Sequence, residues 1–128
     1  MHERILFMIA AGLALAASGL AISAARAAGD ANNGSALYDE KCTGCHSLDA
    51  NRVGPMHRGV YGRKAGSVRD FDYSDALKRA AVVWDEATLD RWLSGPPDFV
   101  PGSKMGFRVG SPADRADLIA FLRAESGK

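Results

Sequence analysis

Cysteine is scarce in this chain, with only Cys42 and Cys45 among 128 residues. A structural zinc site is not expected, because it would need two further thiolate or imidazole ligands at suitable spacing and there is no third cysteine. A redox disulfide of the thioredoxin kind would need alternating strands and helices around the two thiols, and no strand-rich pattern surrounds them. The two cysteines therefore call for another explanation.

A charge excess of one sign is also absent, since the formal net charge is +1. Without residues 1–27 the chain keeps 14 Lys and Arg (16 minus Arg4 and Arg26) and 14 Asp and Glu (15 minus Glu3). Binding of nucleic acid would require a basic excess or stripe. A nucleic-acid partner is therefore not expected.

Strand-forming sequence is nearly missing as well. Val82-Val83-Trp84 is the only β-branched run, and three residues are too few to indicate a sheet. The chain has no internal repeat, low-complexity tract or linker, and its length allows one domain at most. We therefore expect an all-α domain of about four or five helices joined by ordered loops.

The longest apolar run stands at the start of the chain, from Ile5 to Ile22, after a weakly basic start. Ala25-Arg26-Ala27 fits the small-residue pattern of a cleavage site. We interpret residues 1–27 as a secretory signal peptide that is cleaved, and residues 28–128 as the mature domain. The alternative is an uncleaved membrane anchor, but 18 residues are near the lower limit for a spanning helix and no basic stop-transfer flank follows them.

The helical patterns are short and begin at polar caps. The spacing of apolar residues predicts four helices, at Asp30 to Lys41, about Asp75 to Ala80, about Glu86 to Ser94, and from Ser111-Pro112 onward. Asp30, Ser74 and Asp85 are the expected caps, and Gly95-Pro96-Pro97 is expected to stop the third helix.

The remaining segments, Ser47 to Asp72 and Phe99 to Gly110, lack periodicity and are interpreted as ordered loops. We expect the face of the first helix that carries Gly34 and Tyr38 to pack on the last helix, because a small residue lets a second helix approach closely.

Cys42-Thr43-Gly44-Cys45-His46 is the most specific motif of the chain. On a helical turn the two cysteines share one face, so both thiols can meet the two vinyl groups along one porphyrin edge. His46 follows at once, and its imidazole can ligate iron from the proximal side. Neither a zinc site nor a redox disulfide requires that histidine, so we interpret the run as the attachment site of one haem c, with thioethers to Cys42 and Cys45.

A buried haem would also explain how so little regular structure can form a stable domain. About a hundred residues with few long helices would be marginal alone, and a large apolar plate supplies the missing core. Thioether bonds would use up both thiols in an oxidising compartment, so no disulfide is predicted.

The second axial ligand decides what such a haem does. An open position would allow gas binding or peroxide chemistry in a haem enzyme or sensor, whereas strong ligands on both faces restrict the haem to electron transfer. The candidates are Met105, Met56 and His57. Met105 lies in a Pro-Gly loop that can wrap around a haem face. Met56 could also reach the iron, because an extended chain from His46 to Met56 spans about 33 Å. Spacing along the chain therefore does not decide between the two methionines.

Further motifs run nearly throughout residues 29–124. They are Gly54-Pro55, Gly59 with Gly62-Arg63-Lys64, Phe71 to Ala76, Trp84, Thr88-Leu89, Pro101 to Met105 and Arg115 to Ile119. Together with the haem pentapeptide they make the chain resemble the class I c-type cytochromes, of the mitochondrial cytochrome c kind and its soluble bacterial counterparts. The resemblance implies a small single-domain cytochrome c fold wrapped around one covalently attached haem.

The resemblance also assigns roles to single residues. It makes His46 and Met105 the axial iron ligands and lets the Pro55 carbonyl accept the other N–H of the proximal imidazole. The residues expected to hydrogen-bond or neutralise the haem propionates are Arg63, Tyr73, Trp84 and Ser103. Phe107 matches an aromatic residue at the haem edge, and Trp92 stands where the mitochondrial type has a tyrosine that contacts the distal methionine.

Two departures from the family pattern bear on the expected site. His57 lies where a pocket residue is usually apolar, and we expect a surface or hydrogen-bonded histidine rather than an alternative ligand. Pro97 and Asp98 stand near the loop that carries Met105, Phe99 to Gly110, which we call the distal loop. The mitochondrial type has part of a ring of lysines there. Docking through a strongly basic ring is therefore expected to be weaker here.

These expectations combine into a soluble monohaem c-type cytochrome that carries one electron at a time in the periplasm and is not an enzyme. If the N-terminal segment stays attached, the protein would sit at the outer face of the inner membrane. The expected partners are redox proteins, such as a quinol-cytochrome c reductase and a terminal oxidase or photosynthetic reaction centre. No small-molecule substrate is expected, and the protein is expected to be a monomer.

Overall fold

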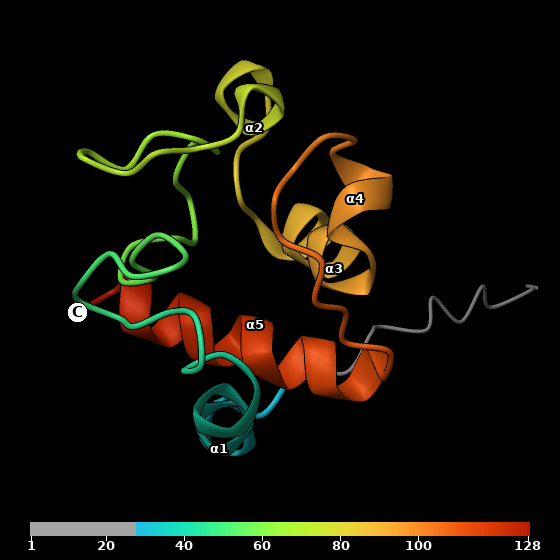
Figure 1. Ribbon diagram of the computed structural model, residues 1–128. Helices are drawn as coiled ribbons and strands as arrows, with labels where there is room; N and C mark the ends of the chain where they lie inside the picture. The colour runs from blue at the N-terminus through green and yellow to red at the C-terminus, as the bar shows by residue number, and fades with distance from the viewer. Residues whose placement is uncertain (1–27) are drawn as a thin grey trace, which may run out of the picture.

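Five helices joined by long loops make up the part of the chain that the computed structural model describes, residues 28–128 (Figure 1). The helices are α1 (Ala31–Lys41), α2 (Asp75–Arg79), α3 (Glu86–Ser94), α4 (Pro96–Phe99) and α5 (Pro112–Ser126). Within these residues no strand forms, and the only β-type pairing is an isolated bridge between Lys64 and Val83. The all-α prediction is confirmed, whereas the expected signal peptide lies outside the described residues.

The helices begin at the polar caps that the sequence predicts. The Asp30 carboxylate accepts hydrogen bonds from the backbone N–H groups of Asn32 and Asn33, at 2.8 and 3.3 Å. Asp85 and Thr88 form a reciprocal capping box at the start of α3. Because such caps satisfy N–H groups that have no partner inside the helix, they fix where each helix starts.

Helix α4 is an addition to the predicted elements. Gly95-Pro96-Pro97 ends α3 as expected, but the two prolines then open a further single turn, from Pro96 to Phe99. Proline is well suited to the first turn of a helix, because its fixed φ angle is already helical and its missing N–H has no helical partner there. The segment therefore both stops one helix and starts the next.

Helices α1 and α5 cross closely at Gly34, as predicted. A Cβ atom at this position would overlap the backbone carbonyl of Asp117 and crowd the Cβ of Phe121. One turn later Tyr38 packs against Phe121, with 5.1 Å between ring centroids. The Asp117 carboxylate also accepts hydrogen bonds from the Asp30 N–H and the Asn33 amide, at 2.7 and 2.6 Å.

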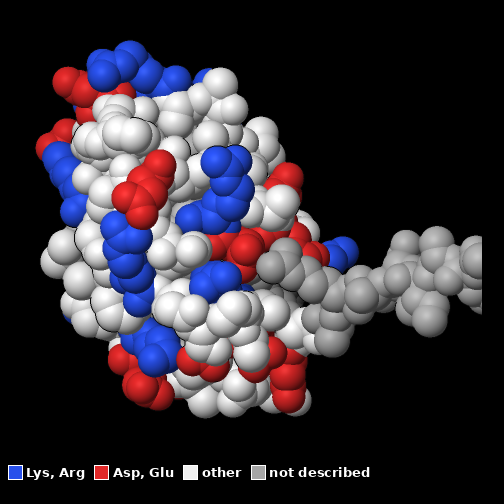
Figure 2. Space-filling view, turned by 90° about the vertical axis from the view of Figure 1, so that its right-hand side faces the viewer, with Lys and Arg blue, Asp and Glu red and all other residues white. Residues whose placement is uncertain are grey.

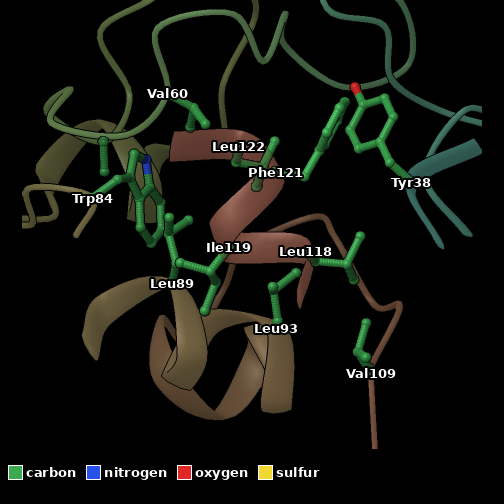
Figure 3. Close-up of a cluster of buried hydrophobic side chains, with 11 residues drawn as sticks. Tyr38, Val60, Trp84, Leu89, Leu93, Val109, Leu118, Ile119, Phe121 and Leu122 are labelled. Carbon is green, nitrogen blue, oxygen red and sulfur yellow. The ribbon is translucent and has the colours of Figure 1, made fainter. Parts of the chain in front are cut away.

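Helix α5 forms the centre of the hydrophobic core (Figure 3). Its residues Leu118, Ile119, Phe121 and Leu122 are all at least 92% buried. Tyr38 from α1 lies on one side of the helix, and residues from α3 and the preceding loop, among them Leu89 and Trp84, lie on the other. In Figure 1, α5 crosses the lower half of the molecule, with α1 below it and α2, α3 and α4 above it. None of the helices in residues 28–128 has the length and apolar character needed to cross a membrane.

The end of α5 is tied to the long loop after α1 through Arg58. The guanidinium of Arg58 binds the carboxylate of Asp49 at 2.5 Å and that of Glu125 at 2.8 Å, and Lys128 also reaches Glu125 at 2.5 Å. The hydrogen bonds from Lys128 and Arg58 hold the pKa of Glu125 below its usual range. A carboxylate with a lowered pKa in the folded state stabilises the fold above the ordinary pKa of about 4.3.

Replacing Glu125 with glutamine should therefore flatten the loss of stability on acidification. The Glu125 contribution is complete above about pH 5 and fades as the pH falls through the lowered folded pKa, so the variant has less to lose. Urea unfolding at about pH 6 and pH 3 measures the difference, with Glu40→Gln as the control because the exposed Glu40 carboxylate meets only Lys41, at 3.6 Å. Equal pH dependence in the wild type and Glu125→Gln would contradict the prediction.

Candidate functional site

One cavity of about 440 Å³ lies between the haem pentapeptide, the loop after α4 and the central helices. Its volume is within the usual range of small-molecule and cofactor sites. Cys42, Cys45 and His46 line it from the pentapeptide, and Met105 and Phe107 line it from the loop. The structure thus brings the two most specific sequence features to the same cavity, although about sixty residues separate them.

The pentapeptide continues the turn of α1 beyond the end of the helix. Cys42 is the C-cap residue, and its carbonyl accepts hydrogen bonds from the N–H groups of Cys45 and His46, at 3.2 and 2.9 Å. Cys42 is half-buried and Cys45 is exposed, and both line the cavity.

The imidazole of His46 is held in one orientation. Its Nδ1 lies 2.9 Å from the Pro55 carbonyl oxygen, the contact that the family resemblance implies, and a donated Nδ1–H leaves Nε2 as the metal-binding atom. The side chain at residue 54 must be absent, because a Cβ atom on Gly54 would overlap the His46 ring. Burial lowers the pKa of His46, which keeps the ring in the neutral form that binds metal.

His57 lies beside His46, in the wall of the same cavity. The two rings are stacked, with 3.9 Å between centroids and 20° between planes, and the Tyr38 hydroxyl lies 3.0 Å from Nδ1 of His57. Burial, with His46 and Arg63 nearby, places the pKa of His57 well below its usual range. The sequence left a surface or a hydrogen-bonded histidine open, and the structure shows the hydrogen-bonded one.

The two candidate methionines are separated by the fold. Met105 lines the cavity, on a loop whose turn is made by Pro101 and by Gly102 with φ of 91°. Met56 is not among the lining residues, and its backbone is engaged by Asn51 and Arg63, at 3.0 and 2.8 Å. Only one of the two methionines is therefore placed to bind a group in the cavity.

Of the residues expected near the propionates, Arg63, Tyr73 and Trp84 line the cavity and Ser103 does not. The Arg63 guanidinium donates to the Met56 carbonyl at 2.8 Å, and the Tyr73 hydroxyl accepts from the Val68 N–H at 3.1 Å. The Ser103 hydroxyl donates to the Pro96 carbonyl at 3.3 Å. Three of the four side chains can thus reach a ligand directly in this arrangement.

The aromatic residues expected at the pocket are both in its wall. Trp92 packs on Trp84, with 5.3 Å between ring centroids, and Phe107 is 50% exposed at the mouth.

Sequence reasoning did not identify Asp72 and Lys104 as wall residues. Their charged groups approach to 3.6 Å and join the segment before α2 to the distal loop. Asp72 and Lys104 are far apart in the sequence, so no local pattern predicts that their side chains meet.

The family model of cytochrome c matches residues 31–126. The chain belongs to the cytochrome c family. It is 45% identical over 126 residues to cytochrome c2 of Rhodomicrobium vannielii, with 94% of both chains covered. It is 42% identical over 102 residues to cytochrome c of Arabidopsis thaliana, which covers 77% of this chain and 91% of the relative.

The fold agrees with this cytochrome c assignment. The solved structure of cytochrome cH from Methylobacterium extorquens superposes with a TM-score of 0.72 at 40% identity, covering 75% of this chain and 99% of the other. Like other members of the family, this protein is an electron carrier rather than an enzyme, and it carries one covalently attached haem c.

The residues of this cytochrome c fit that cofactor. The cavity wall is predominantly apolar, as a porphyrin requires, and two free thiols stand beside an imidazole whose other nitrogen is already bound. The absence of a side chain at Gly54 leaves the room that the imidazole occupies. A thioether, the second ligand of high-potential cytochromes c, is available from the distal loop.

Proposed function

We propose that this cytochrome c carries single electrons between membrane redox complexes in the periplasm, with His46 and Met105 as the axial ligands of its iron. The observation that carries the proposal is the meeting of Cys42, Cys45, His46 and Met105 at one cavity. When bound, the haem supplies a one-electron couple at its iron. The protein residues determine how that couple is attached, oriented and shielded.

Thioethers to Cys42 and Cys45 would hold the cofactor at one edge. The Pro55 carbonyl, 2.9 Å from Nδ1 of His46, fixes the tautomer of the imidazole that would bind the iron. Met105 would close the opposite side with a soft thioether, which favours ferrous iron and a high reduction potential. Arg63, which lines the cavity, would offset the negative charge of the propionates. Because side chains of the protein would bind the iron on both sides, little would have to move when its charge changes.

Export to the periplasm is supported by the sequence of residues 1–27 and by one relative. The match to cytochrome c2 of Rhodomicrobium vannielii covers 94% of this chain. This is a larger share of the chain than the segment after Ala27, which has 101 of the 128 residues. The similarity therefore extends into the expected signal peptide. We propose that residues 28–128 act in the periplasm after cleavage.

The partners we propose are a quinol-cytochrome c reductase and a terminal oxidase or photosynthetic reaction centre. Figure 2 shows basic and acidic side chains interspersed on one face of the molecule, without a large field of one sign. Phe107, half-exposed at the cavity mouth, offers an apolar contact beside the site. Docking of a monomer through a mixed and partly apolar surface therefore fits these residues better than docking through a basic ring.

The full chain, produced with haem attachment and fractionated, tests this proposal. We expect the holoprotein in the periplasmic fraction, a one-electron Nernst titration, and the near-infrared band of methionine bound to ferric iron. Cyanide should bind slowly, because it must displace Met105. Immediate cyanide uptake with no such band would indicate an open iron and would contradict the proposed ligation.

A further inference from the structure

The wall behind His46 contains a pair of polar residues that the haem site itself does not require. Tyr38 is 3% exposed, and its hydroxyl lies 3.0 Å from Nδ1 of His57. An apolar side chain at residue 57 would fill the same space without a hydrogen-bond partner. Burying a hydroxyl and an imidazole is unfavourable unless they are paired, so each of these residues depends on the other.

Both members of the pair are held firmly. The His57 backbone N–H donates to the Ser47 carbonyl at 3.0 Å, and its carbonyl accepts from the Val60 N–H at 2.9 Å. Tyr38 is fixed on α1 and packs against Phe121 of α5, with 5.1 Å between ring centroids. The imidazole of His57 therefore has a defined position, set by two helices and a loop.

The pair acts on His46 through the stacked rings. The His57 ring covers one face of the His46 ring at 3.9 Å between centroids and 20° between planes. The Pro55 carbonyl holds the edge of the same ring at 2.9 Å. Rotation of the His46 imidazole about its bond to Cβ would therefore break the hydrogen bond and disturb the stack together.

We propose that His57, held by the Tyr38 hydroxyl, is a positioning residue that fixes the plane of the axial imidazole and lowers the reduction potential. This inference rests on the proposed ligation by His46. The face of an aromatic ring carries negative charge density. A ring stacked on the axial imidazole therefore stabilises the positive charge that this ligand shares when the iron is ferric.

Two variants of the holoprotein test the pair, with a matched control. His57→Leu should raise the reduction potential by about 59 mV, a tenfold change in the ferrous to ferric ratio at a fixed potential. Tyr38→Phe removes only the hydroxyl and should produce a smaller shift of the same sign. Tyr61→Phe should change nothing, because Tyr61 does not line the cavity and its ring packs beside Arg123, 5.3 Å from the guanidinium carbon.

A second readout separates positioning from packing. The proton NMR shifts of the haem methyl groups in the ferric protein depend on the orientation of the axial ligand planes, and both variants should change their pattern. An unchanged potential and an unchanged methyl pattern in folded Tyr38→Phe and His57→Leu would overturn the inference. If His57→Leu does not retain haem, Tyr38→Phe decides alone.

Failure of the proposed ligation would look different from failure of this inference. A wild-type protein without the methionine-to-iron band, or with an iron that binds cyanide at once, would refute the proposed ligation by Met105, on which the role of His57 and Tyr38 does not depend. A wild-type protein with that band and with variants that match it in potential and methyl shifts would refute only the role of His57 and Tyr38.

Discussion

Replacing Met105 with alanine is expected to abolish the near-infrared methionine-to-iron band and to let cyanide bind ferric protein at once. The reduction potential should fall by several times the roughly 59 mV that correspond to a tenfold change in a one-electron equilibrium. The physical reason is that a thioether stabilises ferrous iron, whereas water, which would replace it, stabilises the ferric form. Absorption spectroscopy and potentiometric titration measure both effects.

Met56→Ala is the matched control for this substitution. It removes the same side chain at the other methionine that spacing along the chain leaves open, but Met56 does not line the cavity. The control should keep the band, the slow cyanide binding and the potential of the wild type. Loss of the band in Met56→Ala with retention in Met105→Ala would reverse the assignment.

The choice between these methionines shows where sequence reasoning reaches its limit. The separation of a residue from His46 sets only the largest distance that the chain can span. The turn at Gly102 is encoded close to Met105, but the packing of α4, which also decides which loop folds over the cavity, is not. Family resemblance selected Met105, and the structure places Met105, not Met56, in the cavity wall.

The helix starts were predictable because their causes are local. Asp30, Ser74 and Asp85 each accept a hydrogen bond from an N–H group two or three residues further along the chain. Helix α4 was not predicted, since the same two prolines that end α3 also suit the first turn of a new helix. Local rules thus located the end of α3 but not the helix beyond it.

Contacts between distant segments could not be derived from the sequence in the same way. The pairing of Tyr38 with His57 joins a helix to a loop that shows no periodicity, so no sequence pattern predicts this contact. The Ser103 hydroxyl turns to the Pro96 carbonyl, a direction that its place in the motif does not determine. Such contacts depend on the tertiary packing of α5 against the rest of the chain.

The crossing of α1 and α5 at Gly34 is such a tertiary contact, and it is the site of the largest expected loss of stability. Gly34→Ala should lower the free energy of unfolding by about 1–3 kcal/mol, the usual effect of overpacking. Alanine favours a helix by about 1 kcal/mol over glycine, so the two effects oppose each other. The clash is expected to dominate, because the new Cβ would meet the rigid backbone of Asp117 and not the end of a flexible side chain.

Gly110→Ala provides the comparison, since a Cβ at residue 110 would meet no atom within 4 Å. This control should be as stable as the wild type or slightly more stable, because alanine restricts the unfolded chain. Urea unfolding of both holoproteins measures the difference between them. If Gly34→Ala were as stable as Gly110→Ala, α1 could move away from α5 without lowering the free energy of unfolding. The position of Tyr38, and with it the anchor of His57 behind the axial imidazole, would then not depend on this crossing.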